Sequence, residues 1–171
     1  MSEPVSIRVL TAADALAYRE VRLAALRADP LAFITTADEF AVRPLADLAA
    51  QLEPGPGAVT FGAFGDGGLV GLLSVVRETR PRLAHRANVF GVSVLPGARG
   101  QGCGEALLRA GIACARGWPG LSSLHLGVTE TQTAARRLYE RHGFEVWGTQ
   151  PDAVRDAEGT SYAEHHLALR L

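Results

Sequence analysis

The chain has 171 residues, 47% of them hydrophobic, and a formal net charge of -1 at pH 7. This length suits one well-buried core and is short for two, so we expect a single domain over residues 1–171. The near-neutral charge argues against a nucleic-acid partner or an anionic membrane surface. No apolar run reaches the roughly 18 residues of a membrane span, and the N-terminus lacks the form of a signal peptide. We therefore expect a cytoplasmic protein.

The hydrophobic periods, taken in chain order, predict a mixed α/β fold without internal repeats. Strands are expected at residues 6–10, 59–64, 69–76, 88–94, 124–128, 146–149 and 162–169, and helices at residues 11–27, 44–52, 103–117 and 134–144. Thr11 and Asp14 have the spacing of a capping box at the first helix start. Residues 31–40 show no clean period, and residues 150–159 are expected to form a loop.

Residues 92–104, VSVLPGARGQGCG, join an apolar strand to a helix through three closely spaced glycines. The free N–H groups and the positive end of the helix dipole make such a junction an anion site. Glycines at positions 100, 102 and 104 allow a phosphate to approach the backbone closely. Arg99 adds a cation, so the stretch predicts a phosphorylated cofactor.

The glycine spacing excludes two common phosphate motifs. A dinucleotide fingerprint places a third glycine where this chain has Glu105 or Leu107. A Walker loop ends in Gly-Lys-Ser/Thr, and all 17 Lys+Arg residues of this chain are arginines.

The stretch instead resembles the Arg/Gln-x-x-Gly-x-Gly/Ala signature of the GNAT superfamily of N-acetyltransferases. The matching residues are Arg99, Gly100, Gln101, Gly102, Cys103 and Gly104. In that family the amides of this loop hold the pyrophosphate of acetyl-CoA. The pantetheine arm binds the exposed edge of the preceding strand, here at Val92 and Val94. The resemblance implies a mostly antiparallel sheet flanked by helices, in which a splayed strand pair forms the acetyl-CoA cleft.

A second stretch resembles the family pattern Asn-x-x-Ala-x-x-Leu-Tyr followed by Gly-Phe. It is carried by Gln132, Ala135, Leu138, Tyr139, Gly143 and Phe144. Gln132 replaces the family's Asn, and its longer amide is expected to bond the pantetheine arm. Gly143 suits the C-terminal cap of the helix.

Acetyl transfer to an amine needs a neutral nucleophile, a donor to the developing oxyanion and an acid for the departing thiolate. The resemblance implies that the N–H of Val94 is the oxyanion donor and that Tyr139 is the acid. A tyrosine that only packs in the core is the alternative. The candidates for the base are Glu78, His85 and Ser93, and a water chain is a further alternative.

The remaining reactive side chains carry weaker signals. Cys103 and Cys114 are separated by about 16 Å along a helix, too far for a disulfide. An alternative role for Cys103 is that of a nucleophile that accepts the acyl group. The sequence gives this role little support, because no His lies near Cys103. His165 and His166 point to opposite faces of a strand, so no metal site is expected.

The resemblance therefore implies an acetyl-CoA-dependent N-acetyltransferase that acts on a primary amine of a small molecule. The alternatives are a protein N-terminal acetyltransferase, which would take a peptide N-terminus, and a non-catalytic acyl-CoA sensor. Protein-directed family members often carry a Glu where this chain has Gly127, which argues against the first alternative. Acceptor selectivity is expected to lie in the first helices and in residues 77–86. Residues 31–52 are expected to line the acceptor cleft, simple packing being the alternative, and a homodimer stays open.

Overall fold

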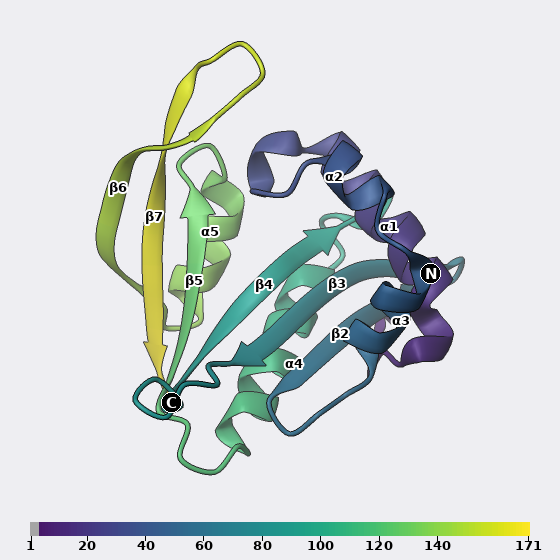
Figure 1. The fold of residues 1–171 in the computed structure, drawn as a ribbon, viewed down its shortest axis with the longest axis horizontal. Coiled ribbons are helices and arrows are strands. Elements are labelled where there is room, and N and C mark those ends of the chain that lie inside the picture. The colour runs from purple at the N-terminus through teal and green to yellow at the C-terminus, as the bar shows by residue number, and fades with distance from the viewer. Residues whose placement is uncertain (1–3) are drawn as a thin grey trace.

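The computed structural model describes residues 4–171 and contains one seven-stranded sheet in the order β1-β2-β3-β4-β5-β7-β6 (Figure 1). All neighbouring strands are antiparallel except β4 and β5, which are parallel. The strands are β1 (Ser6–Val9), β2 (Ala58–Gly65), β3 (Gly68–Arg77), β4 (Arg86–Val94), β5 (Ser123–Thr129), β6 (Glu145–Arg155) and β7 (Ser161–Arg170). The α-helices are α1 (Ala15–Ala28), α2 (Ala37–Ala41), α3 (Leu45–Leu52), α4 (Cys103–Arg116) and α5 (Thr133–Arg141).

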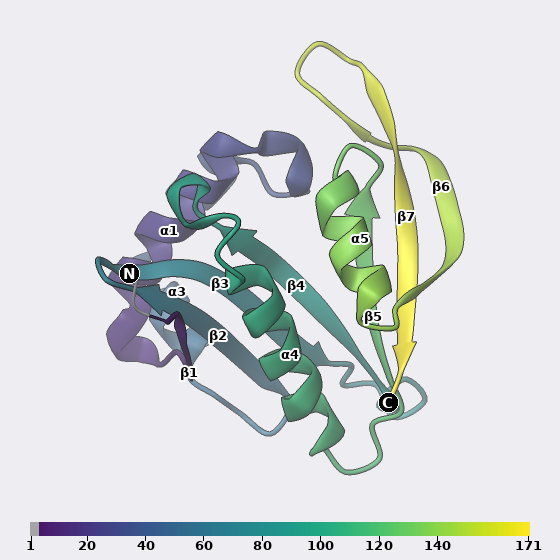
Figure 2. The ribbon, with the colours of Figure 1, turned by 180° about the vertical axis from the view of Figure 1, so that it is seen from behind.

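Helices cover both faces of the sheet, because successive side chains of the central strands point to opposite sides. Leu73 and Val75 of β3 pack in a core with α4, whereas Leu72 packs in a second core with α1 and α3. Figure 2 shows α4 and α5 in front of the sheet, on the face opposite to α1 and α3. This arrangement confirms the predicted α/β class with a mostly antiparallel sheet.

Strands β4 and β5 separate along their length, and the space between them positions the site. They pair only where Arg86–Asn88 meets Ser123–His125, and Figure 1 shows them diverging from that end. The β3–β4 register shifts between Leu72 and Ser74, and Gly91 has φ +60° there. Such a bulge bends its strand, so β4 turns away from β5 beyond the paired end. The predicted splayed pair is confirmed.

One prediction about secondary structure was wrong, and one segment without a predicted structure contains a helix. Residues 150–155 belong to β6 instead of a loop. Both faces of this segment are largely exposed, so it lacks the alternation of polar and apolar residues that marks a half-buried strand. Pro151, which cannot donate a backbone hydrogen bond, lies where the pairing of β6 with β7 is irregular. Residues 31–40 contain the short helix α2, which begins at a Thr36–Glu39 capping box. That capping box was readable in the sequence.

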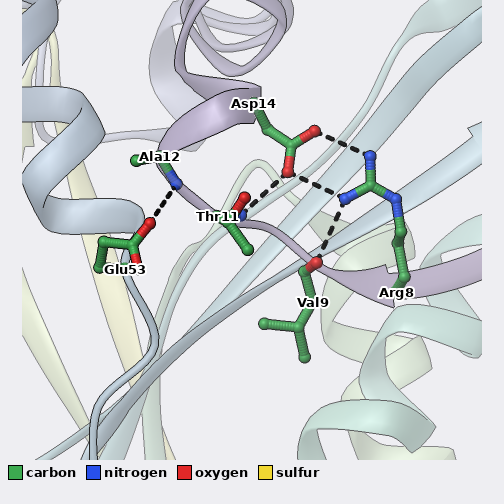
Figure 3. Close-up of polar contacts among 6 residues, drawn as sticks. All are labelled: Arg8, Val9, Thr11, Ala12, Asp14 and Glu53. Carbon is green, nitrogen blue, oxygen red and sulfur yellow. Dashed lines mark hydrogen bonds and ion pairs between the residues drawn. The ribbon is translucent and has the colours of Figure 1, made fainter.

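The start of α1 is held by a polar network around Asp14 (Figure 3). The Arg8 guanidinium donates to both carboxylate oxygens of Asp14 at 2.8 and 2.9 Å, and the Thr11 N–H donates to Asp14 Oδ2 at 2.9 Å. These contacts hold the pKa of Asp14 below its usual value, the hydrogen bond from Arg8 being the main cause. Nearby, the Ala12 N–H donates to Glu53 Oε1 at 2.7 Å, so the segment that follows α3 also holds this turn.

We expect Asp14→Asn to lower the free energy of unfolding by about 1 kcal/mol at pH 7, because a bidentate pair and a capping bond are lost. The half-exposed Arg8 limits the effect through solvent screening. The folded-state pKa is lowered, so this stabilisation is present above an unfolded-state pKa of about 3.9 and is lost as the pH falls through the folded value. Urea unfolding at several pH values measures the difference. Asp66→Asn, in the exposed β2–β3 turn, is the control, and equal stability of both variants at pH 7 would contradict the expectation.

Candidate active site

The predicted phosphate loop connects β4 to α4. Gly100 and Gly102 have φ of +75° and +81°, a region that favours glycine. Gly102 is the N-cap of α4, and the Ala106 N–H donates to its carbonyl at 3.0 Å. The N–H groups of Cys103, Gly104 and Glu105 therefore precede the first intrahelical bond and have no acceptor within the helix. This cradle of backbone donors fits an anionic pyrophosphate.

The edge of β4 beside the loop also carries free backbone donors. The Leu95 N–H donates to the Val70 carbonyl at 2.8 Å, so positions 93 and 95 face β3. Hydrogen-bonding direction alternates along an antiparallel strand, so the N–H groups of Val92 and Val94 face away from β3. No β5 residue pairs with this part of β4. An extended ligand arm can therefore bond to this edge in the manner of an additional strand.

Side chains around the loop hold its shape. Arg99 Nε donates to the Val94 carbonyl at 3.1 Å, and Gln101 Nε2 donates to the Gly97 carbonyl at 3.4 Å. The Cys103 side chain is 1% exposed, and burial raises the pKa of its thiol. A higher thiol pKa reduces the thiolate population, so it does not favour the nucleophile alternative.

Helix α5 brings the second motif beside the loop. A Cβ added to Gly104 would lie 3.4 Å from Leu138 Cδ2, so α5 packs against the start of α4. Gln132 Nε2 donates to Asp29 Oδ1, at the end of α1, at 3.2 Å. The Gln132 amide thus joins the two helices that lie on either side of the splayed strands.

Tyr139 is 6% exposed and packs edge-on against Phe144, with the ring centroids 6.0 Å apart. Burial raises the pKa of Tyr139 to about 12. Its hydroxyl makes no hydrogen bond with any residue between 4 and 171. The position suits both a packed aromatic and a proton-holding group, so its catalytic role stays a prediction.

Of the three candidate bases, Ser93 lies apart from Glu78 and His85. Glu78 accepts a hydrogen bond from Asn88 Nδ2 at 3.0 Å, and the His85 carbonyl accepts from the Ser122 N–H at 2.8 Å. Both positions are at the paired end of β4 and β5, roughly 20 Å along the strand from Val92 at 3.3 Å per residue. Ser93 is buried and donates its hydroxyl to the Gly91 carbonyl at 3.3 Å. Their roles as bases stay predictions.

A cleft of about 650 Å³ opens on the α1 face of the sheet, between β3, β4, β5 and β7. Ala32, Phe33, Ile34 and Thr35 line it, so part of the predicted acceptor segment lies at this cleft. Three arginines also line it, namely Arg22, Arg43 and Arg86. Burial, followed by the charge of Arg86, lowers the pKa of His125 at the same cleft.

Arg22 is the notable cation of the cleft. Its guanidinium lies 4.4 Å from the ring centroid of Phe33, and a Cβ on Gly91 would lie 3.4 Å from its Nη1 atom. Nη1 is buried and has no hydrogen-bond partner among the described residues, and burial lowers the pKa of Arg22. A desolvated cation without a counterion is costly, which makes the site receptive to an anion.

One carboxylate, Glu164, is present among the residues that line the cleft. It extends over Gly127, where an added Cβ would fall on its Oε1 atom. Sequence reasoning missed both Arg22 and Glu164, since each lies in an amphipathic pattern that also fits ordinary surface residues. Gly127, a glycine within a strand, was a readable signal of close approach by another group.

Comparisons with known proteins agree with this geometry. The model of the Acetyltransferase (GNAT) family matches residues 24–144. An L-amino acid N-acetyltransferase of Escherichia coli is 32% identical over 122 residues, which are 71% of this chain and 73% of that protein. A mycothiol acetyltransferase of Salinispora tropica is 42% identical over 81 residues, 47% of this chain, and the chain spans only 26% of that protein.

A solved structure from Salmonella typhimurium, which holds the cofactor acetyl-CoA, superimposes with a TM-score of 0.79 at 23% identity. The superposition covers 99% of this chain and 95% of that one. The splayed sheet with its glycine loop thus has the acetyltransferase fold. The chain belongs to the Acetyltransferase (GNAT) family.

The described helices include none that is both long and apolar enough to cross a membrane.

Proposed function

We propose that this protein transfers the acetyl group of acetyl-CoA to the primary amine of a small amino acid. The observation that carries the acceptor class is Arg22, a partly desolvated guanidinium at the cleft whose buried Nη1 atom has no hydrogen-bond partner among the described residues. An acceptor carboxylate would neutralise it and form charge-assisted hydrogen bonds. The similarity to an L-amino acid N-acetyltransferase supports the same class.

The cleft also suits an apolar acceptor side chain. Ile34, Phe90 and Trp147 line it and are 79%, 54% and 66% exposed. Burying apolar surface stabilises a complex by roughly 25 cal/mol per Å² before the costs of association. We therefore expect amino acids such as leucine and phenylalanine to be better acceptors than glycine.

Acetyl-CoA would be held by the free N–H groups at the start of α4 and by the exposed edge of β4. When bound it supplies the activated acetyl group as a thioester. The Val94 N–H would donate to the carbonyl oxygen as negative charge develops there. Arg99 lies beside the loop, where its charge favours the pyrophosphate.

A panel of acceptors with acetyl-CoA, followed by release of the CoA thiol, tests the proposal. L-Leucine and L-phenylalanine should release CoA faster than their decarboxylated amines. A peptide N-terminus as the better acceptor would favour a protein N-terminal acetyltransferase. If none of the acceptors tested causes release of CoA, an acyl-CoA sensor would be favoured.

Arg22→Met should raise KM for L-leucine by about 10- to 100-fold, the loss expected for a charge-assisted hydrogen bond of roughly 1.5–3 kcal/mol. KM for the decarboxylated amine should change little. Thermal stability should stay equal or rise, because a buried charge without a partner is removed. Arg27→Met, on an exposed position of α1, is the matched control. Equal KM changes for both acceptors would show that Arg22 does not bind the carboxylate.

A further inference from the structure

We infer that Glu164, on β7, is the residue that binds the acceptor ammonium and removes its proton. The inference rests on the proposed function. It concerns the general base, for which the sequence offered only Glu78, His85 and Ser93.

The strand register brings the Glu164 carboxylate to the gap between β4 and β5. Thr129 pairs with Glu164 and Gly127 pairs with His166, so Glu164 is a diagonal neighbour of Gly127 on one face of the sheet. Gly127 has no side chain, and the carboxylate occupies the space that a Cβ would fill. The space beside position 127 of β5 is therefore filled by a carboxylate that comes from β7.

This position is level with the point where β4 bends away. The last parallel pair joins Asn88 to His125, so Gly127 would lie opposite Phe90 if the pairing continued. Phe90 is two residues before Val92, about 7 Å along the strand. Measured along the strand, the candidate bases Glu78 and His85 lie roughly 20 Å from Val92, about three times the distance between Phe90 and Val92.

The electrostatic surroundings leave Glu164 available to an ammonium. Its side chain is 16% exposed and forms no hydrogen bond with the described residues, and its Oε1 atom lies 3.8 Å from His166 Nδ1. It is the one carboxylate among the residues that line the cleft, whose other ionisable side chains are one tyrosine, three arginines and two histidines. An amino acid bound between Arg22 and Glu164 would have both of its charges paired.

The proposed step balances without a further reactant. A Glu164 oxygen takes one proton from the R–NH3+ group, and the neutral nitrogen then attacks the thioester carbonyl carbon. The C–N bond forms and the C–S bond breaks. The nitrogen, positively charged in the tetrahedral intermediate, loses its second proton, and the departing thiolate takes up one proton in its place. The products are the N-acetyl compound and CoA–SH, with one proton released to solvent when Glu164 ionises again.

Glu164→Gln tests the inference, because glutamine keeps the shape of the side chain and cannot accept the proton. At pH 7 we expect kcat/KM for L-leucine to fall by about 100-fold or more, as for a lost general base. The deficit should shrink as the pH rises through the pKa of the acceptor amine, since the amine then arrives neutral. Acetyl-CoA affinity, measured by calorimetry, should stay at the wild-type value.

Other titratable or charged groups face the same cleft and are tested beside it. They are Tyr18 and Arg22 on α1, Arg43 after α2, Arg86 on β4, His125 on β5 and His166 on β7. His166→Gln should not reproduce the pH-dependent deficit of Glu164→Gln. Glu158→Gln, in the exposed β6–β7 turn, is the matched control and should behave as wild type.

A relocation variant adds a second arm. Glu164→Gly combined with Gly127→Glu returns a carboxylate to the same space from β5, and it should recover part of the activity lost in Glu164→Gly alone. If the wild-type protein acetylates L-leucine and Glu164→Gln loses less than threefold of that activity at pH 7, the inference is overturned. The proposed function then stays intact. A wild-type protein that acetylates no amino acid would instead remove the proposed function.

Discussion

Tyr139→Phe is expected to lower kcat by about 100-fold, near the low end for a lost general acid, while acetyl-CoA affinity stays close to wild type. Phenylalanine keeps the ring, its burial and the edge-on contact with Phe144. A purely structural tyrosine would lose at most one hydrogen bond on this substitution. None joins its hydroxyl to the described residues, so that loss would be small.

The size of the effect follows from the pKa of Tyr139, which burial raises to about 12. A free thiol has a pKa of about 8.5, so complete proton transfer from Tyr139 to a thiolate is uphill by roughly 5 kcal/mol. In the predicted role Tyr139 would therefore act best as a hydrogen-bond donor to the leaving sulfur, which is why we expect the lower end of the range. Because the pKa is raised, the hydroxyl stays protonated through neutral and mildly alkaline pH. Its ionisation should therefore not limit the rate below about pH 11.

Steady-state and single-turnover kinetics with an accepted amine measure this effect, and Tyr162→Phe on β7 is a matched control. Thermal unfolding of both variants shows whether the fold persists. Less than a threefold change in kcat for a folded Tyr139→Phe protein, with chemistry limiting the rate, would remove Tyr139 from the mechanism.

Gly102→Val is expected to weaken acetyl-CoA binding by at least about 100-fold. Gly102 has φ +81°, a conformation that a β-branched residue rarely adopts. Relaxation of this strain would turn the N-cap of α4 and redirect the N–H groups that follow it. Two lost charge-assisted hydrogen bonds, at roughly 1.5 kcal/mol or more each, account for the expected loss of affinity.

Calorimetric titration with acetyl-CoA measures the affinity, and the melting temperature reports the cost to the fold. Gly97→Val is the matched control, because Gly97 lies just before the loop, has no positive φ and would admit a Cβ into open space. A folded Gly102→Val protein with an affinity within threefold of wild type would refute the phosphate-loop assignment.

The sequence by itself determined the loop between β4 and α4. Gly100 and Gly102, which the sequence placed in this loop, have positive φ values, and Gly143, the predicted C-terminal cap, follows α5 with φ +92°. These features depend on neighbouring residues, because a glycine conformation or a first helical turn needs only local contacts. Strands with one buried face were also predictable, because polar and apolar residues alternate along their sequence.

Only the tertiary structure decided the acceptor side of the cleft. Arg22 loses its water because Phe33 and the bulge at Gly91 pack around it, and none of these contacts is local in sequence. Glu164 reaches the gap because β7 pairs with β5 in a register that sets it beside Gly127. A side chain's desolvation and its distance to a partner depend on strand order and register. Residues far apart along the chain therefore form a charge pattern that no short motif encodes.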